Sequence, residues 1–528
     1  MNVPDCSVDD CAVSLAHEEE LENAESCVED SLPRSGADLL LPAMLGGAAL
    51  AGLALQSGCA PPGPPPPIGP LPDAPPVALT PELRRLVNRV TYGIDAREAY
   101  LANTLGFQGY LEYQLAYESI DDSDLDQVLA GFSTLNLTPK ERLIELNAEN
   151  NTPVAEYLHA KFLGTAYSTR QLFERMVEFW SDHFNIFFEK EFEEVFKPVD
   201  DQEVIRQHAL GTFPELLSAS AHSPAMLLYL DSIGSMKEAP NENYPRELME
   251  LHTIGPDNFT QEDVKEVSRC FTGWSLNIDF DSPDTGRFLF RPQWHDNGAK
   301  HVLGHEIPAG GGQQDGEIVL QILTTDPAIA PFTAQLVGRK IAVQFWGYDP
   351  PQSLVDSIAA TYMSTGGDIR SMIRTALEPN MLMQAPMKLK RPYHYALGAM
   401  RMRPSSIGNP FIFSFILRLL EHHPGLWPAP NGYPDSSGYW GGFLLMRWSY
   451  GAYLAIPDET KLFDLDPFVE PISVDELLSR INAWFFNGAM PPATDAELRA
   501  YINAAPEEPF RRLEAVGMAL GSPDFQWY

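Results

Sequence analysis

A chain of 528 residues with 72 acidic side chains against 36 basic ones has a net charge of −36. Nucleic-acid binding needs a basic face, and attraction to anionic membranes needs basic clusters, so this balance argues against both. Hydrophobic residues make up 44% of the chain and aromatic residues 11%, which indicates a globular protein with a large buried core.

The N-terminal region combines an acidic head with an export-signal-like segment. Residues 1–58 carry eleven acidic residues and one basic residue, Arg34. Leu39 to Leu55 is an apolar run of 17 residues, near the lower length limit for a membrane span. Cys59 follows after a small residue, and ten prolines lie within residues 60–76. This layout is typical of a bacterial lipoprotein signal, so we predict export to the cell envelope, either lipid-anchored through Cys59 or extracellular.

Two features of this region leave other interpretations open. Gln56 stands where such signals usually have an apolar residue, and the residues before the apolar run are acidic instead of basic. A secretory signal cleaved nearby, a start codon assigned too far upstream or a buried hairpin of a cytosolic domain would also fit. The prolines favour export, because they are typical of a semi-rigid spacer from a surface.

The body of the chain is predicted to be mainly helical. We expect an acidic head with its apolar segment at 1–58, a proline-rich tether at 59–79 and a single large multi-helical domain at 80–528. Helical periodicity begins at Thr80 and recurs to about residue 520, whereas residues 274–304 contain short strand patterns separated by turns. These patterns predict a small antiparallel β insertion at about 274–304. Cys270 is the only cysteine of this body, which excludes an internal disulfide framework.

One stretch stands out chemically, from Asn241 to Trp274 (NENYPRELMELHTIGPDNFTQEDVKEVSRCFTGW). It combines amide, guanidinium, carboxylate, imidazole and indole groups, a mixture that an ordinary pair of surface helices does not need. We therefore expect a functional site here, with Asn241, Asn243 and Trp274 as candidate binding residues. The first half predicts a helix that begins at Asn243 and ends near Thr253.

The faces of this first helix separate its polar residues. At 100° per residue, Glu247 and His252 share an arc with two leucines, so both should border buried surface. Arg246 and Glu250 lie on the other side, at the spacing of an i,i+4 ion pair. Glu247, His252 and Arg246 are the candidate catalytic residues, although a polar network between packed helices would use the same side chains.

The second half predicts another helix. Thr260 opens it with a capping box that ends at Asp263. Its apolar stripe comprises Val264, Val267, Cys270 and Phe271. Cys270 on this stripe is expected to be a buried small hydrophobic residue and not a nucleophile.

The stretch resembles the signature of the bacterial domain-of-unknown-function family 1800, roughly N-E-N-[YF]-A-R-E-L-x-E-L-H-T-x-G, then Y-T-x-x-D-V and T-G-W. Pro245 stands here in the usual Ala position and Phe259 in the usual Tyr position. Other blocks resemble the family in order along residues 80–528: LRRLVNRVTYG (83–93), GFQGYLEYQL (106–115), ERMVEFWSDHFNI (174–186), FLFRPQWHDNGAKHVLG (288–304), MKLKRPYHYALGAMR (387–401) and LWPAPNGYPDSSGYWGGFLLMR (426–447).

The resemblance implies a mostly helical, exported bacterial protein without a settled activity. Proteins that resemble this family are often encoded beside a second exported family similar to sulfatases and phosphatases. A companion protein of that kind, and joint action on envelope or extracellular material, are therefore implied as well.

Imidazole and carboxylate groups in these blocks suggest a metal site. His183, His252, His295 and Asp296 are candidate ligands for a divalent metal such as zinc or manganese, with Glu247 as a spare base. The leading hypothesis is a metal-dependent hydrolase that acts on an extracellular polymer or ester. The chain lacks HExxH, paired CxxC, GxSxG, GxGxxG and P-loop motifs, so no standard signature supports it. A core histidine at 183 and a simple Asp turn at 296 remain alternative interpretations.

A non-catalytic function is the competing hypothesis. Trp440 is a candidate binding residue in an aromatic and glycine-rich loop at 427–442. Such a loop would stack on sugar rings or dock a partner protein at the cell surface, although it would equally serve to cover a helical core.

Overall fold

The computed structural model describes residues 75–148, 150–402, 410–455, 465–469, 472–505, 508 and 510–528. All of them belong to the second of two units of the chain, Cys59–Tyr528. The predicted export segment, Cys59 and most of the proline tether lie outside the described residues. No helix in the described ranges is both long and apolar enough to cross a bilayer.

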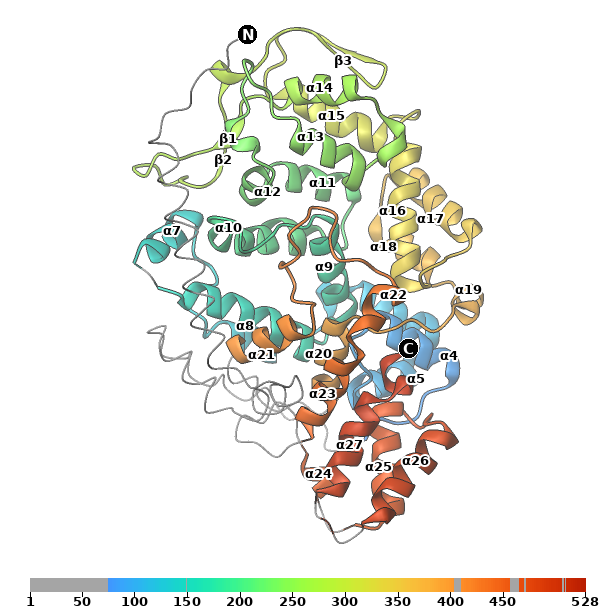
Figure 1. Cartoon of the computed structure of the whole chain (residues 1–528). Coiled ribbons are helices and arrows are strands. Elements are labelled where there is room, and N and C mark those ends of the chain that lie inside the picture. Colours follow the sequence, from blue (N-terminus) through green and yellow to red (C-terminus); the bar gives the residue numbers. More distant parts are fainter. Residues whose placement is uncertain are drawn as a thin grey trace, which may run out of the picture. The chain divides into compact units, whose positions relative to one another are not determined.

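Helices dominate the first half of the described chain (Figure 1). They are α4 (Pro81–Val90), α5 (Ala96–Leu115), α6 (Ser123–Leu129), α7 (Pro139–Asn147), α8 (Thr152–Tyr167), α9 (Gln171–His183), α10 (Glu193–Asp200), η2 (Asp201–Arg206), α11 (Phe213–Ala221), α12 (Pro224–Tyr229), α13 (Asn243–Glu247), η4 (Leu248–His252) and α14 (Gln261–Cys270), with short turns η1 (Tyr117–Ser119), η3 (Ser232–Gly234) and η5 (Pro256–Asn258). Thr80 begins α4 as predicted, because its side chain accepts a hydrogen bond from the Leu83 amide.

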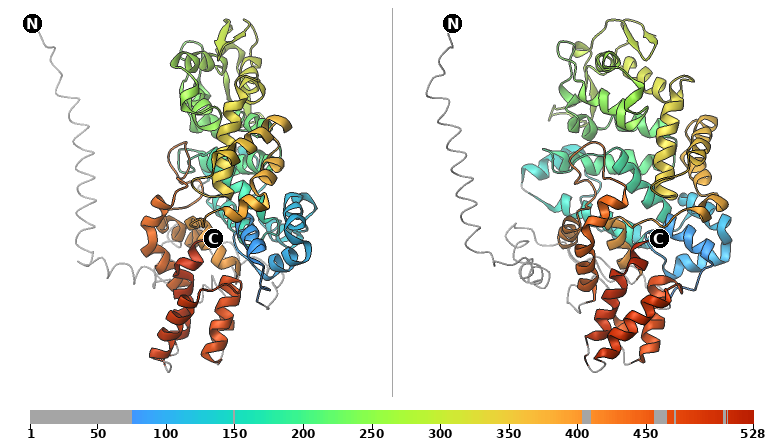
Figure 2. Two further views of the ribbon diagram at one scale, coloured as in Figure 1. Left: turned by 90° about the vertical axis from the view of Figure 1, so that its right-hand side faces the viewer. Right: turned by 45° about the vertical axis from the view of Figure 1, so that its right-hand side comes forward.

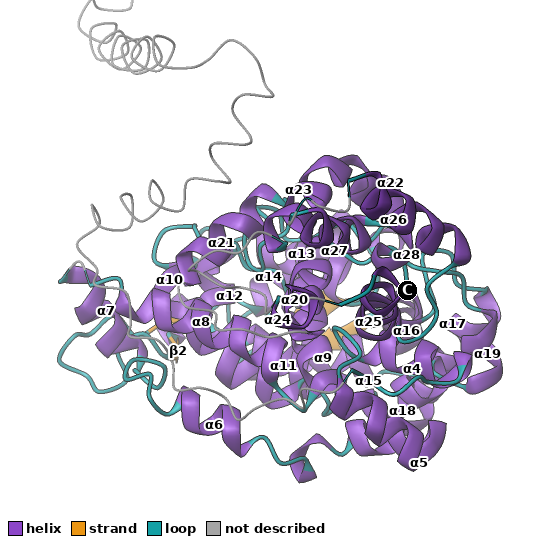
Figure 3. Ribbon diagram, turned by 90° about the horizontal axis from the view of Figure 1, so that it is seen from below, coloured by secondary structure: helices purple, strands orange, loops and turns teal. Residues whose placement is uncertain are grey.

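The β insertion is confirmed and runs slightly further than predicted. Two antiparallel pairs form it: β1 (Trp274–Leu276) with β2 (Phe288–Phe290), and β3 (Lys300–Val302) with β4 (His305–Ile307). In the first pair Trp274 lies opposite Phe290, and in the second Lys300 lies opposite Ile307. A short turn, η6 (Pro292–Trp294), joins the two pairs. Figure 3 shows the strands as small patches among helices.

The second half of the chain is again helical. Its elements are α15 (Gln314–Thr325), α16 (Ala330–Phe345), α17 (Gln352–Thr365), α18 (Ile369–Ala376), α19 (Pro379–Gln384), α20 (Pro392–Met402), α21 (Pro410–Leu419), α22 (Ser437–Trp440), η7 (Gly441–Phe443), α23 (Leu444–Leu454), α24 (Asp466–Val469), α25 (Val474–Phe486), α26 (Pro492–Ala504), α27 (Arg511–Gly521) and α28 (Pro523–Gln526). Both views of Figure 2 place α16 beside α17, and α25 to α27 at the end remote from the strands. The mainly α fold with a small β insertion is therefore confirmed.

Two hydrophobic cores hold the described residues together. The first is built from α4, α5, the α9 to α19 region and the strands, and the second from α8 and the helices from α20 onward. The last residues of the chain return to the first helix of the fold, since Tyr528 and Lys388 exchange backbone hydrogen bonds and α19 packs on α4. The first helix and the last residues of the described chain therefore border the same space between the cores.

Candidate functional site

The stretch from Asn241 to Trp274 folds as a helix, a turn and a second helix, as predicted. The first helix continues from α13 into the π-helical turn η4 and ends at His252. Asn243 is its first residue and not its cap, because no side chain caps this end. Thr260 and Asp263 form the predicted capping box of α14, with Thr260 Oγ1 2.6 Å from Asp263 Oδ2.

The two candidate asparagines fasten neighbouring loops. Asn241 Nδ2 donates to the Asp231 carbonyl at 3.1 Å, and its Oδ1 accepts from the Asn243 amide at 2.8 Å. Asn243 Nδ2 donates to the Leu230 carbonyl at 3.4 Å. These contacts join the end of α12 to the start of α13, which gives both asparagines a structural role.

Arg246 and Glu247 border solvent. Arg246 donates to Gln261 Oε1 at 2.7 Å and lies 3.6 Å from Glu242. The predicted pair with Glu250 is therefore replaced by one with the residue four positions earlier. Glu247 is half-buried, and burial together with nearby Glu250 raises its pKa above the usual range.

Two of the predicted metal ligands, His183 and His252, lie side by side, although 69 positions separate them in the sequence. Their ring centroids are 5.8 Å apart, and His183 Nε2 lies 3.2 Å from the His252 carbonyl oxygen. Both rings are buried, and burial lowers the pKa of His252 to about 3 and that of His183 well below its usual range. His252 Nε2 has no hydrogen-bond partner among the described residues.

The third polar side chain beside the two histidines is a lysine, Lys340. A metal site would need a carboxylate or a third histidine at this place. Lys340 of α16 donates to His183 Nδ1 at 2.8 Å and to the Leu251 carbonyl at 3.3 Å. Burial lowers its pKa to about 8. The Lys340 ammonium contacts His183 Nδ1, and the His252 carbonyl oxygen contacts His183 Nε2. Both ring nitrogens of His183, through which it would bind a metal, therefore already have partners.

His295 and Asp296 belong to different clusters. The His295 ring lies 3.1 Å from Asp315 Oδ2 and 2.8 Å from the Thr272 carbonyl oxygen, and Lys300 pairs with the same Asp315 carboxylate at 2.5 Å. Asp296 binds Arg269 at 2.7 Å and accepts the Gly298 amide at 2.8 Å, which is the alternative turn interpretation.

The four predicted metal ligands therefore do not form one group. Among the described residues, no set of three or more His, Cys, Asp and Glu side chains is arranged to hold a metal ion. Of the predicted set, only His183 and His252 come together.

Both candidate tryptophans are buried. Trp274 packs against His222, Phe271 and Phe288. Trp440 packs against His422, and the Arg391 guanidinium lies 5.8 Å from its ring centroid. Neither indole ring faces solvent, so stacking on a sugar would have to use other residues of the loop at 427–442.

The aromatic loop covers a polar network on α9 and α20 that the sequence did not predict. Arg391 pairs with Asp182 at 2.7 Å and contacts His422 Nε2 at 3.2 Å, while the Tyr433 amide donates to the same aspartate at 2.9 Å. Burial raises the pKa of Asp182, and Arg391 opposes that rise. The network joins the blocks at 174–186, 387–401 and 426–447.

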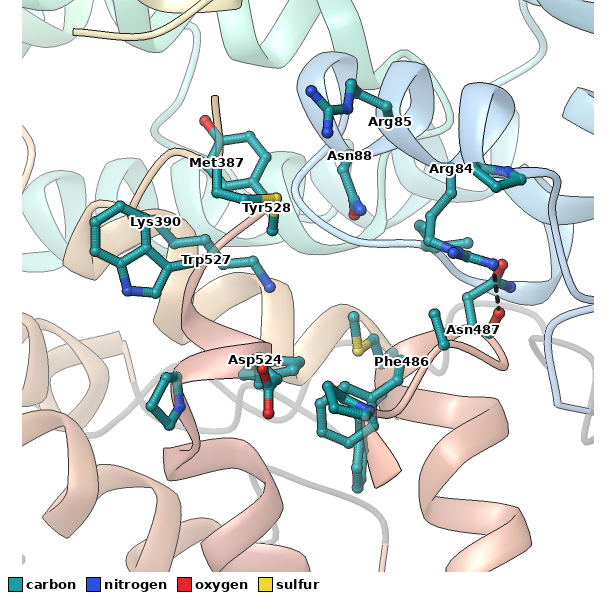
Figure 4. Close-up of a pocket in the computed structure, with 18 of the residues that line it drawn as sticks. Arg84, Arg85, Asn88, Met387, Lys390, Phe486, Asn487, Asp524, Trp527 and Tyr528 are labelled. Carbon is teal, nitrogen blue, oxygen red and sulfur yellow. Dashed lines mark hydrogen bonds between the residues drawn. The ribbon is translucent and has the colours of Figure 1, made fainter. Parts of the chain in front are cut away.

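A cavity of about 510 Å³ lies between the two cores. Its walls come from α4, the start and end of α20, the end of α25 and the residues around α28 (Figure 4). The blocks at 83–93 and 387–401 both contribute to it, although about 300 positions separate them. A volume in this range suits a small organic ligand.

The charged lining of this cavity is basic. Arg84, Arg85 and Lys390 line it together with one carboxylate, Asp524. Arg84 donates to the Leu79 and Asn487 carbonyls, and Arg85 to the Leu382 and Ala385 carbonyls. Neither arginine has a carboxylate within 4.0 Å among the described residues, and burial lowers both pKa values. Asp524 accepts a hydrogen bond from Thr494.

The rest of the lining is largely aromatic. Trp484, Phe485 and Phe486 come from α25, and Phe525, Trp527 and Tyr528 from the last residues of the chain. Asn88 of α4 adds an amide. The cavity therefore combines an apolar wall with a few basic groups, the usual composition of a site for an organic anion.

The cavity could not be predicted from the sequence, although several of its residues lie in the family blocks at 83–93 and 387–401. Arg84 and Arg85 look like surface residues of an amphipathic helix, and Lys390 stands in a basic run, KLKR, that would suit an exposed loop. The missing signal was the lack of acidic partners, which depends on spatial neighbours and not on sequence neighbours.

Comparison with known proteins identifies a family and no individual relative. No curated protein and no solved structure matches the chain. A family model, described as a protein of unknown function (DUF1800), matches residues 85–527, which contain the polar network, both histidines and most of the cavity lining, but not Arg84. The chain therefore belongs to the DUF1800 family.

Proposed function

We propose that this protein binds an organic anion with an apolar body in the cavity between its two cores. The observation that carries the proposal is the set of basic groups without acidic partners. Arg84, Arg85 and the neighbouring Arg89 of α4 have no carboxylate within 4.0 Å among the described residues. The chain has twice as many acidic as basic residues, so unneutralised arginines on one helix call for an explanation.

Electrostatics supports an anionic ligand. Arg84 and Arg85 are half-buried and lack a counter-charge, which an anionic ligand in the cavity would supply. Arg84 and Arg85 keep part of their hydrogen-bonding capacity after binding loop carbonyls, and guanidinium groups suit carboxylate, sulfate and phosphate geometry.

The wall supports an apolar body on that anion. Trp484, Trp527 and Phe525 offer ring surface that a simple inorganic anion would leave uncovered. An aromatic or aliphatic carboxylate, sulfonate or phosphate ester would use both the basic groups and the rings.

A matched pair of fluorescent compounds tests the proposal. We expect the anion 8-anilinonaphthalene-1-sulfonate to bind at least about tenfold more tightly than uncharged N-phenyl-1-naphthylamine, a difference of about 1.4 kcal/mol. Fluorescence of the compounds, excited through the tryptophans of the chain, reports binding, and the variants below locate it. Equal affinity for the two compounds would show that the basic groups do not select an anion.

Variants locate the binding. Arg85→Gln should weaken sulfonate binding several-fold, and Arg85→Lys should restore most of it because the charge returns. Arg499→Gln removes one exposed cation on α26, remote from the cavity lining, and should change nothing. Melting curves establish that each variant is folded. Unchanged binding in Arg85→Gln would place the compound elsewhere.

The metal-dependent hydrolase remains a prediction, and fewer observations support it than support anion binding. It rests on the buried pair His183 and His252. Elemental analysis of the purified full chain tests it: about one zinc or manganese per chain, lost in His252→Gln, would support it, and a metal-free chain would contradict it. The glycan- or partner-binding scaffold and the companion sulfatase- or phosphatase-like protein also remain predictions.

A further inference from the structure

Lys390 differs from the other buried lysines of the described chain. Lys197, Lys300 and Lys388 are each buried and each has a carboxylate partner: Asp200 at 2.6 Å, Asp315 at 2.5 Å and Asp435 at 2.6 Å. Lys390 is also buried, at 4% exposed, but no carboxylate lies within 4.0 Å of its Nζ among the described residues.

Neighbouring residues fix the backbone of Lys390, whereas its side-chain amine faces the cavity. Its backbone is fixed by Gln526 and Arg447, which contact its amide and carbonyl. Its Nζ lies over the Phe525 ring, 3.9 Å from the ring centroid. Figure 4 shows the end of the side chain turned into the open space of the cavity.

Such an environment favours the neutral amine. Burial and the positive charge of Arg447 lower the pKa of Lys390 to about 7. At pH 7 about half of the Lys390 side chains would be neutral, compared with fewer than about one in a thousand for an ordinary lysine. A neutral amine is a nucleophile, and burial is a recognised way to activate one.

We propose that Lys390 is a covalent site that forms an imine with an organic anion bearing an aldehyde or ketone. The inference rests on the proposed anion-binding function and names the substrate class for the same cavity. Arg84, Arg85 and Asn88 lie on the α4 wall and would hold the anionic group, while the carbonyl carbon meets the amine on the α20 side.

The chemical step is balanced without an added reagent. The nitrogen lone pair of Lys390 attacks the carbonyl carbon, forming a C–N bond as the C=O π bond breaks, and one N–H proton passes to the carbonyl oxygen to give a carbinolamine. The hydroxyl then leaves as water after a second protonation, and the nitrogen loses its remaining proton as the C=N bond forms. No atom is oxidised or reduced, and hydrolysis reverses the step.

Reductive trapping tests the inference in the full-length protein. Pyridoxal 5′-phosphate serves as the compound, because it joins an aldehyde and an anion to an aromatic ring. After equimolar mixing at pH 7, borohydride reduction and peptide mapping, we expect Lys390 to carry at least about tenfold more label than Lys388 or the exposed lysines. Lys388, buried but paired with Asp435, and exposed Lys265 are internal controls.

The outcomes separate this inference from the proposed function. Label on exposed lysines with Lys390 unmodified would overturn the imine, even where the sulfonate still binds as proposed. Absence of both label and sulfonate binding would overturn both. In a folded Lys390→Arg variant the label at this position should disappear while the label on Lys388 and Lys265 stays as it was. Lys265→Met, a change outside the cavity lining, should leave both the Lys390 label and sulfonate binding unchanged.

Discussion

At the scale of single residues, burial determines the protonation of the histidine pair. His183 and His252 pack against each other and against Phe184, and Lys340 holds the remaining position at His183. A second positive charge in this space would be unfavourable, so both rings remain neutral in the folded protein.

This neutrality predicts a pH dependence of stability. The pKa of His252 falls from 6.5 to about 3 in the fold, so between those values the unfolded chain binds more protons. The free energy of unfolding should therefore decrease as pH falls from 6.5 towards 3. His252→Gln should reduce this slope by up to about 1.4 kcal/mol per pH unit, measured by urea unfolding between pH 7 and pH 4.

The matching control is His301→Gln. The His301 ring is exposed and pairs with Glu306 at the surface, so water surrounds it in the folded and unfolded chain alike. His301→Gln thus removes a histidine without removing a buried ring, and the loss of slope should be larger in His252→Gln. Equal slopes in the wild type and His252→Gln would mean that His252 is protonated in the fold.

A second residue-scale prediction concerns the capping box of α14. Thr260→Ala removes the side chain that accepts the Asp263 amide at 3.2 Å and should lower the free energy of unfolding by about 1 kcal/mol. Thr104→Ala, at an exposed interior position of α5, should cost nothing, because alanine is the better helix former. Thermal melts compare the two variants, and equal melting temperatures would contradict the cap.

At the scale of elements, the loop at 427–442 is built to lie directly on α9. Gly432 has φ +70°, and a Cβ placed on it would come within 2.2 Å of the Asp182 carbonyl oxygen. Only glycine allows this approach, which brings the Tyr433 amide to Asp182 and Trp440 to Arg391.

Gly432→Ala should therefore lower the free energy of unfolding by about 2 kcal/mol or more, through a backbone clash and a strained φ together. Gly438→Ala in the same loop is the matched control, because a Cβ there meets nothing within 4 Å. Urea unfolding measures both. Similar midpoints for the two variants would show that the loop can move away from α9 without cost.

At the scale of the whole molecule, charge is distributed unevenly. The chain carries −36 overall, yet the charged groups that line the cavity are mainly basic. An acidic exterior repels anions at long range, so selectivity for an anionic ligand has to arise inside the cavity, where salt screens less than at the surface.

Export is the prediction that belongs to the whole chain. If the apolar run and Cys59 act as a lipoprotein signal, mass spectrometry of the native protein should find a mature N-terminus at Cys59 with a lipid mass on its thiol. Replacement of Cys59 by Ser should remove the lipid, while Cys270→Ser, a change at a buried position of α14, should not. Intact residues 1–30 in the mature protein would contradict export.

The sequence determined what depends on near neighbours. The capping box at Thr260, the buried stripe with Cys270 and the strands after Trp274 follow from spacing along a single segment, and the structure confirms them. The family could also be recognised, because its blocks are local patterns. Helix periodicity correctly predicted that the side chains of His183 and His252 are buried, since the direction in which a side chain points depends on its own helix.

Only the tertiary structure decided what meets what. Lys340 stands beside His183 across 157 positions, and His295 pairs with Asp315 and Lys300 instead of joining the other histidines. The cavity is lined by α4 and by residues near 390, 486 and 525. Its basic character therefore arises because segments far apart in the sequence pack together. The spacing of residues along one helix determines the direction of each side chain but not the residue that it contacts, because such contacts depend on how distant segments pack together.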